Sequence, residues 1–125
     1  MKYMTAAQAV QLIESGDSLY IQGSTSIPEV LSQALAERGQ ELKDVTVYAA
    51  FAVGRCEAPY CRPEYKEAFN VKSLFVANNI RRWLADGYGT TIPAFLGEIP
   101  ALFRDGTLPL DAVFLNVSPP DENGY

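Results

Sequence analysis

The chain has 125 residues, a length typical of a single domain with a buried core, and 48% of its residues are hydrophobic and 20% charged. Its net charge is −5 and its only adjacent basic pair is Arg81-Arg82, which argues against a surface that follows nucleic-acid phosphates. With no apolar run of membrane-spanning length and no signal-peptide core, the sequence predicts a cytoplasmic protein that binds neither nucleic acid nor membrane.

The first predicted helix begins at Thr5, because Thr5 and Gln8 have the spacing of a capping box. Apolar residues then recur at helical spacing, and Gly16 is expected to end the helix. Residues 18–22 are predicted to form a short strand.

A loop of small residues, Gly23-Ser24-Thr25-Ser26, follows this strand. Ser26 and Glu29 also have capping-box spacing, and Pro28 suits the first turn of a helix because its missing N–H costs nothing there. We therefore expect a second helix that starts at Ser26 and ends at Gly39. Its apolar face comprises Val30, Leu31, Ala34 and Leu35.

The remainder of the chain alternates between strands and helices. Strands are predicted at 45–51, 73–77, 88–92 and 111–117, and helices at 64–69, 80–85 and 94–104. The first of these strands is apolar throughout, which is typical of a parallel strand covered on both faces. The alternation predicts one α/β domain over residues 1–125, with an open, mostly parallel sheet flanked by helices.

The two cysteines, Cys56 and Cys61, are too few for a disulfide framework or a zinc site, so we expect reduced thiols, no metal and no bound cofactor. The chain contains no histidine. This removes Ser-His and Cys-His nucleophiles from the possible mechanisms.

Ligands of open parallel sheets collect at the carboxyl ends of strands and at the N-termini of the helices that follow. Gly23, Ser24 and Thr25 occupy such a junction and are the candidate substrate-binding residues. The glycine allows close approach, and the helix offers free N–H groups to an anion or a carbonyl oxygen. An ordinary strand–helix turn is the alternative. Residues 78–82 follow another strand, and there the alternative is a helix cap with solvated arginines.

The C-terminal sequence Ser118-Pro119-Pro120-Asp121-x-x-Gly124, directly after the strand at 111–117, resembles the end of the N-terminal domain in the acetyl-CoA hydrolase/transferase family, of the 4-hydroxybutyrate and butyryl-CoA:acetate CoA-transferase type. The resemblance covers nearly the whole chain and is most specific from Phe75 onward. Other matching positions are Gly23, Pro28, Leu31, Arg81, Gly87, Ile92-Pro93, Phe95-Leu96, Glu98-Ile99-Pro100 and Leu110-Asp111.

The resemblance implies an enzyme that moves coenzyme A between an acyl-CoA thioester and a small carboxylic acid. In such enzymes a glutamate attacks the acyl-CoA and forms an acyl-glutamyl anhydride, then a glutamyl-CoA thioester. That glutamate lies in the C-terminal domain, which the resemblance makes a partner of this one. The N-terminal domain would form one wall of the active-site cleft, within a homo-oligomer of the full-length protein.

Glu122-Asn123-Gly124 has the form of the sequence around the catalytic glutamate in related two-subunit 3-oxoacid CoA-transferases. The preceding Ser-Pro-Pro-Asp matches a domain-end loop instead, so we assign no catalytic residue within this chain. The chain alone is therefore expected to be inactive. Two alternatives stay open: a stand-alone α/β domain that binds a small anion or regulates without catalysis, and a relative of sugar-phosphate isomerases that shares only the fold.

Overall fold

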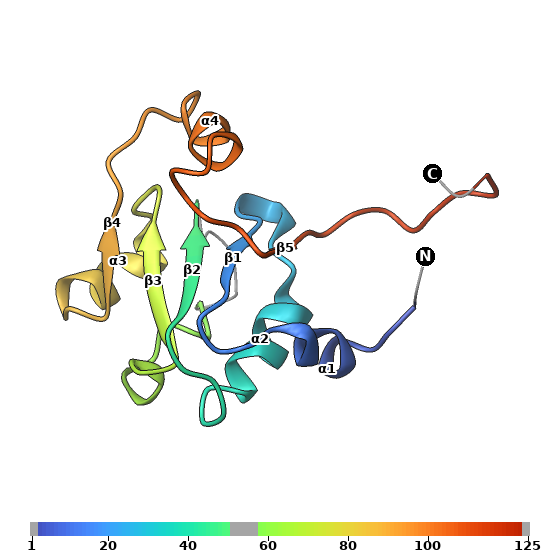
Figure 1. Ribbon diagram of the computed structural model, residues 1–125, viewed down its shortest axis with the longest axis horizontal. Helices are drawn as coiled ribbons and strands as arrows, with labels where there is room; N and C mark the ends of the chain where they lie inside the picture. The colour runs from blue at the N-terminus through green and yellow to red at the C-terminus, as the bar shows by residue number, and fades with distance from the viewer. Residues whose placement is uncertain (1–2, 51–57, 124–125) are drawn as a thin grey trace.

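The computed structural model describes residues 3–50 and 58–123, without the side chain of Asn79. Five parallel strands form one sheet in the order β4-β3-β2-β1-β5 (Figure 1). The strands are β1 (Ser18–Ile21), β2 (Val45–Ala49), β3 (Phe69–Ser73), β4 (Gly89–Thr91) and β5 (Ala112–Phe114). The predicted α/β class is confirmed, and the pairing is parallel throughout.

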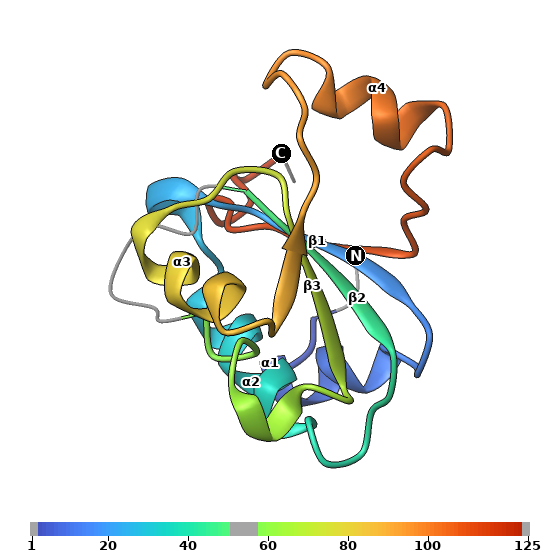
Figure 2. The same ribbon diagram turned by 90° about the vertical axis from the view of Figure 1, so that its left-hand side faces the viewer.

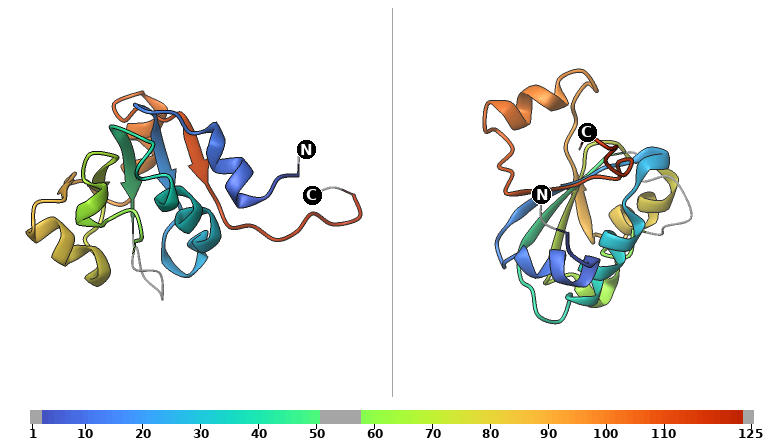
Figure 3. Two further views of the ribbon diagram at one scale, coloured as in Figure 1. Left: turned by 90° about the horizontal axis from the view of Figure 1, so that it is seen from below. Right: turned by 90° about the vertical axis from the view of Figure 1, so that its right-hand side faces the viewer.

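The helices lie on both faces of this sheet. They are α1 (Ala6–Ala9), α2 (Glu29–Glu37), α3 (Asn78–Ala85) and α4 (Ile99–Arg104), with 3₁₀ turns η1 (Val10–Leu12), η2 (Ser24–Ser26) and η3 (Pro63–Tyr65). Figure 2 shows α1, α2 and α3 on one side of the sheet and α4 on the other, and Figure 3 gives the same arrangement from two further directions. None of the described helices is long and apolar enough to cross a membrane.

Two apolar clusters hold these layers together. The larger one lies beneath α1, α2 and α3 and includes Leu19, Val47 and Val71, each no more than 1% exposed. Burying a side chain of this size stabilises the fold by about 1.5–3 kcal/mol. The smaller cluster lies beneath α4, where the ring of Phe103 meets Tyr20 and Tyr48 edge-on at centroid distances of 5.7 and 5.3 Å. On the face of the sheet that carries α4, the apolar side chains are therefore covered mainly over the middle strands.

The N-terminal helix begins as predicted. Gln8 N–H donates to the Thr5 hydroxyl at 3.2 Å, and Thr5 N–H donates to the Gln8 side chain at 3.0 Å, which confirms the capping box. The helix tightens into η1 after Ala9, earlier than Gly16. The Arg38 guanidinium donates to the carbonyl oxygens of Val10, the first residue of η1, and of Ile13, which follows η1, and so joins this segment to the end of α2.

Four of the predicted elements differ from the structure in position or length. The third strand is Phe69–Ser73, and residues 74–77, predicted as that strand, connect it to α3 instead; the helix predicted at 64–69 is limited to η3. The helix predicted at 94–104 begins only at Ile99, which places Pro100 in its first turn, where proline is tolerated. The strand predicted at 111–117 pairs only over Ala112–Phe114.

Candidate functional site at the carboxyl edge of the sheet

The loop after β1 contains the three residues that the sequence proposed as a substrate-binding site. Gly23 is half-buried with φ −105° and ψ −166°, an extended conformation open to any residue. Ser24 has φ 61°, in the left-handed region that non-glycine residues rarely adopt. Ser24 and Thr25 are both exposed. Backbone strain in this loop therefore belongs to Ser24 and not to the glycine, and such strain is often found at binding sites.

The N-terminus of α2 differs from the prediction. The helix starts at Glu29, its N-cap is Pro28, and no side chain caps it, so the expected Ser26–Glu29 capping box is wrong. Ser26 belongs to η2 instead, because the chain turns once before it enters the helix. The first helical bond joins Ser32 N–H to Pro28 C=O at 2.9 Å. Within the described residues the backbone N–H groups of Val30 and Leu31 have no acceptor.

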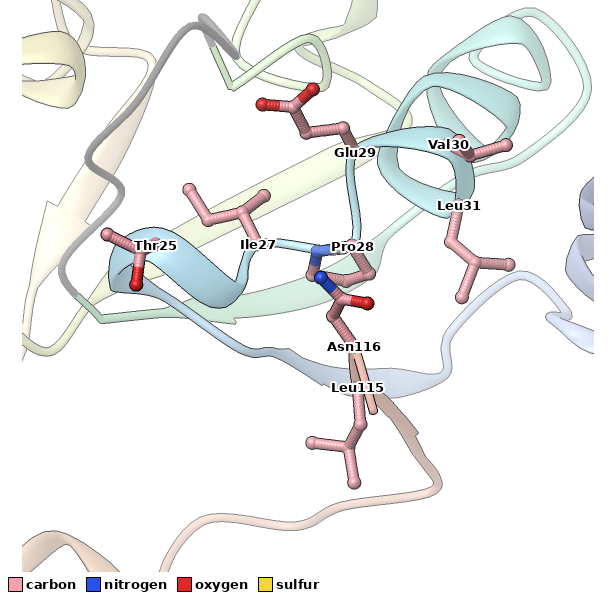
Figure 4. A pocket seen from close by; sticks show the side chains of 8 residues that line it. All are labelled: Thr25, Ile27, Pro28, Glu29, Val30, Leu31, Leu115 and Asn116. Carbon is pink, nitrogen blue, oxygen red and sulfur yellow. The ribbon is translucent and has the colours of Figure 1, made fainter. Parts of the chain in front are cut away.

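A pocket of about 410 Å³ lies beside this uncapped end (Figure 4). It is lined by Thr25, Ile27, Pro28, Glu29, Val30, Leu31, Leu115 and Asn116. Thr25 is the only member of the predicted trio that lines it. Leu115 and Asn116 come from the segment after β5, which the sheet order places beside β1.

The sequence analysis missed this contribution from the C-terminal segment. Gln22 N–H donates to Phe114 C=O at 3.0 Å, and the Gln22 side-chain oxygen accepts from Asn116 N–H at 2.7 Å. These two bonds hold the segment after β5, which forms one wall of the pocket, against the loop after β1. The available signal was that both segments directly follow strands, but their adjacency depends on a strand order that the sequence does not state.

The pocket combines apolar walls with a partly positive helix end. Ile27, Val30, Leu31 and Leu115 provide the apolar surface, and Glu29 is the only charged residue among those lining it. The unpaired amides carry the positive end of the α2 dipole, which favours a carboxylate or a developing oxyanion. Because no cation lines the pocket, it offers little to a chain of phosphates.

The other residues that the sequence analysis considered for a functional site lie away from this pocket. Arg82 faces Asp86 on the exposed side of α3 at 3.8 Å, and neither arginine at 81–82 lines the pocket. Glu122 is exposed in the segment that runs away from the sheet in Figure 1, where Asn123 N–H donates to the Asp121 side chain at 2.9 Å. That turn gives Glu122 no contact with the pocket.

The buried cysteine is not suited to nucleophilic chemistry. Cys61 is 2% exposed, and burial raises the pKa of its thiol from 9.0 to about 12, so the thiolate is scarce at neutral pH. Cys56 lies outside the described residues. Over residues 3–50 and 58–123, no three metal-ligating side chains gather into a cluster.

Comparison with known proteins places this geometry in a family. The family model for the acetyl-CoA hydrolase/transferase N-terminal domain matches residues 1–125. The succinyl-CoA:acetate/propanoyl-CoA:succinate CoA transferase of Fasciola hepatica is 32% identical over 90% of this chain, which covers 23% of that protein. The 4-hydroxybutyrate coenzyme A transferase of Clostridium kluyveri is 29% identical over 99% of this chain and 28% of its own length.

A solved structure shows the same fold. The crystal structure of RipA from Yersinia pestis superposes with a TM-score of 0.84 and 27% identity over 97% of this chain and 30% of RipA. The chain thus spans less than a third of the relatives it matches. It belongs to the acetyl-CoA hydrolase/transferase family and corresponds to part or all of that family's N-terminal domain.

Proposed function

We propose that this domain forms one wall of the active-site cleft in an enzyme that transfers coenzyme A from an acyl-CoA thioester to a small carboxylic acid. The carrying observation is the uncapped N-terminus of α2 beside an apolar pocket, in a chain whose whole length matches this family. The relatives named above are CoA transferases, which supports transfer as the activity.

The properties of the pocket suit one part of the substrate and not another. Its volume and apolar walls suit a short acyl chain or the acid that accepts coenzyme A, while its lack of cations is unsuited to the phosphates of coenzyme A. We therefore assign the acyl and acid portion to this wall. The phosphate-bearing portion then belongs to the polypeptide outside residues 1–125.

The resemblance implies that a glutamate outside this chain attacks the thioester carbonyl carbon. Negative charge then develops on the carbonyl oxygen before the thiolate leaves. Backbone donors that are already oriented stabilise such an oxygen without reorganising. The amides of Val30 and Leu31, at the N-terminus of α2, are such groups on the described pocket.

Binding of carboxylates to the 125-residue chain tests this assignment. Butyrate titrated against ¹⁵N-labelled protein is expected to shift the amide signals of Thr25, Val30 and Leu31 in a saturable manner. Desulfo-CoA, which carries the phosphates without an acyl group, is expected to leave those three signals unchanged. Shifts confined to other regions would contradict the assignment of the pocket.

A matched variant separates the pocket from general ion effects. Asn116→Lys places an ammonium group at the pocket wall beside Pro28, where it is expected to attract the carboxylate and move the butyrate-induced shifts toward residue 116. Leu96→Lys adds the same charge on the β4–α4 connection and should leave the shifts unaltered. Tight butyrate binding by the isolated chain, at micromolar concentration, would instead favour a stand-alone binding domain.

A further inference from the structure

The charge of the pocket beside α2 bears on the kind of acid that it can hold. Glu29 is the only charged residue among those that line it. The side chain is exposed, and among the described residues its carboxylate has no ion pair and accepts no hydrogen bond. The negative charge of Glu29 is therefore not neutralised by any neighbour in the described part of the chain.

The unpaired amides at the start of α2 determine where one carboxylate of a bound acid lies, because they are the positive end of the helix dipole. The rest of the acid then has two ways to extend along the pocket. In the view of Figure 4, the side chains of Leu31 and Leu115 point downward, and those of Ile27 and Glu29 point upward. One direction is thus apolar, and the other leads past a negative charge.

Neither direction accommodates a second carboxylate. Toward Leu31 and Leu115 a carboxylate loses hydration and meets no cation in return. Toward Glu29 it meets a charge of its own sign. The remaining polar side chains of the lining, Thr25 and Asn116, are neutral. They can hydrogen-bond to a hydroxyl group on the chain, but they do not neutralise an anion.

The relatives of this chain leave the charge of the acid open. The Fasciola hepatica relative is named for succinate, a dicarboxylate, and is 32% identical to this chain. The Clostridium kluyveri relative is named for 4-hydroxybutyrate, a monocarboxylate, and is 29% identical. The choice between the two classes of acid therefore has to be argued from the residues of the pocket.

We propose that the acid exchanged by this protein is a short-chain monocarboxylate, and that Glu29 is the residue that discriminates against dicarboxylates. The inference rests on the proposed function, which assigns the acid to this pocket. A volume of about 410 Å³ admits a four-carbon acid of either class. Discrimination between butyrate and succinate therefore comes from charge and not from size.

Three acceptor acids of similar length test the class of substrate in the full-length protein, with acetyl-CoA as the donor. They are butyrate, succinate and succinamate, in which a neutral amide replaces one carboxylate of succinate. The kcat/KM for butyrate is expected to exceed that for succinate by about tenfold or more, with succinamate between them. Equal values for butyrate and succinate would overturn this inference alone. Transfer to none of the three acids would overturn the proposed function as well.

Glu29→Gln tests the assigned residue, because it removes the charge and keeps the shape of the side chain. It is expected to raise the kcat/KM for succinate relative to butyrate by about fivefold and to leave the ratio of succinamate to butyrate unchanged. Each ratio is measured on one preparation, so a loss of folded protein cancels and cannot imitate the effect.

Glu37→Gln is the matched control. Glu37 is also exposed on α2 but lies at its other end, about 12 Å along the helix, and does not line the pocket. This variant should leave the ratio of succinate to butyrate unaltered. An unchanged ratio in Glu29→Gln, or the same change in both variants, would overturn the role of Glu29.

Discussion

The side-chain oxygen of Gln22 accepts a hydrogen bond from Asn116 N–H at 2.7 Å, across 94 positions of sequence. A side chain here occupies the place that the next backbone carbonyl of β1 would take in a regular parallel ladder. The bond holds the segment after β5 beside α2. It therefore determines whether Asn116 and Leu115 form a wall of the pocket.

Replacing Gln22 with alanine is expected to lower the free energy of unfolding by about 1 kcal/mol, the usual net value of one intramolecular hydrogen bond. Exchange of the Asn116 amide should accelerate more than that of any residue within β1. Urea unfolding and hydrogen exchange on the same preparation measure both effects.

Gln40→Ala is the matched control, because Gln40 is exposed and its side chain has no hydrogen bond among the described residues. It should leave both quantities unchanged. An unaltered Asn116 exchange rate in the Gln22 variant would mean that the bond does not hold this wall.

The order of elements could be predicted from the sequence because each signal for it is local. Thr5 and Gln8 form the expected capping box, and strands and helices alternate as the apolar spacing indicated. The strand order and the pocket could not be predicted in this way. Both depend on β5 lying next to β1, a contact between distant segments.

The misplaced third strand has a specific cause. The apolar run at 74–77 favoured a strand there, whereas β3 alternates between buried and more exposed residues. Phe69 and Val71 face the larger cluster, while Lys72 lies 5.9 Å from the ring of Tyr48 on the other face. Because α4 does not cover the whole second face, alternation was the correct signal for this strand.

The Ser26–Glu29 signal failed for a different reason. Capping-box spacing describes which side chains can reach a helix end, but η2 uses Ser26 in a separate turn before α2 starts. The helix amides are thereby left for another acceptor. The loop at Gly23, Ser24 and Thr25 remains a prediction as a substrate-binding element.

The thiol of Cys61 should make stability depend on pH in the alkaline range. Its folded-state pKa of about 12 exceeds the reference value of 9.0, so the unfolded chain loses the proton first as pH rises. The stabilisation is complete below pH 9 and disappears between pH 9 and about 12. Within that window the free energy of unfolding should fall by up to about 1.4 kcal/mol per pH unit on this account.

Comparison with Cys61→Ala isolates this contribution, because burial also raises the pKa values of Tyr20 and Tyr48, which both proteins share. The alanine variant should be less stable at pH 8 but show a shallower decline above pH 9. Parallel declines in the two proteins would assign the pH dependence to other groups. In a Cys56→Ala background, the native protein should also resist thiol reagents at pH 8.

The 125-residue chain is expected to show no transfer or hydrolysis of acetyl-CoA above the buffer rate, because the proposed nucleophile lies outside it. Release of free thiol measures this activity. Glu122→Gln should change nothing, since Glu122 is exposed and remote from the pocket. Turnover that disappears in this variant would make Glu122 the nucleophile and refute its assignment to a domain-end loop.

The loop at Gly23 provides the sharpest test of the cleft wall. Gly23→Val places a β-branched side chain in the loop that the sequence analysis predicts to bind substrate, although Gly23 itself does not line the pocket. In the full-length protein this change is expected to lower the transfer rate about tenfold, or about 1.4 kcal/mol of transition-state stabilisation. Folding should suffer less, because Gly23 has φ −105°, which valine also adopts.

Gly97→Val is the appropriate control for this substitution. Gly97 has open space around its Cα and a backbone that accepts a side chain, whereas Gly87 has φ +83° and would be strained by any replacement. Transfer rate and thermal unfolding should be measured on one preparation of each variant. A normal rate in Gly23→Val would exclude the loop from the cleft. A rate lost together with the fold would show that Gly23 only builds a turn, since a side chain that merely blocks substrate leaves the unfolding temperature in place.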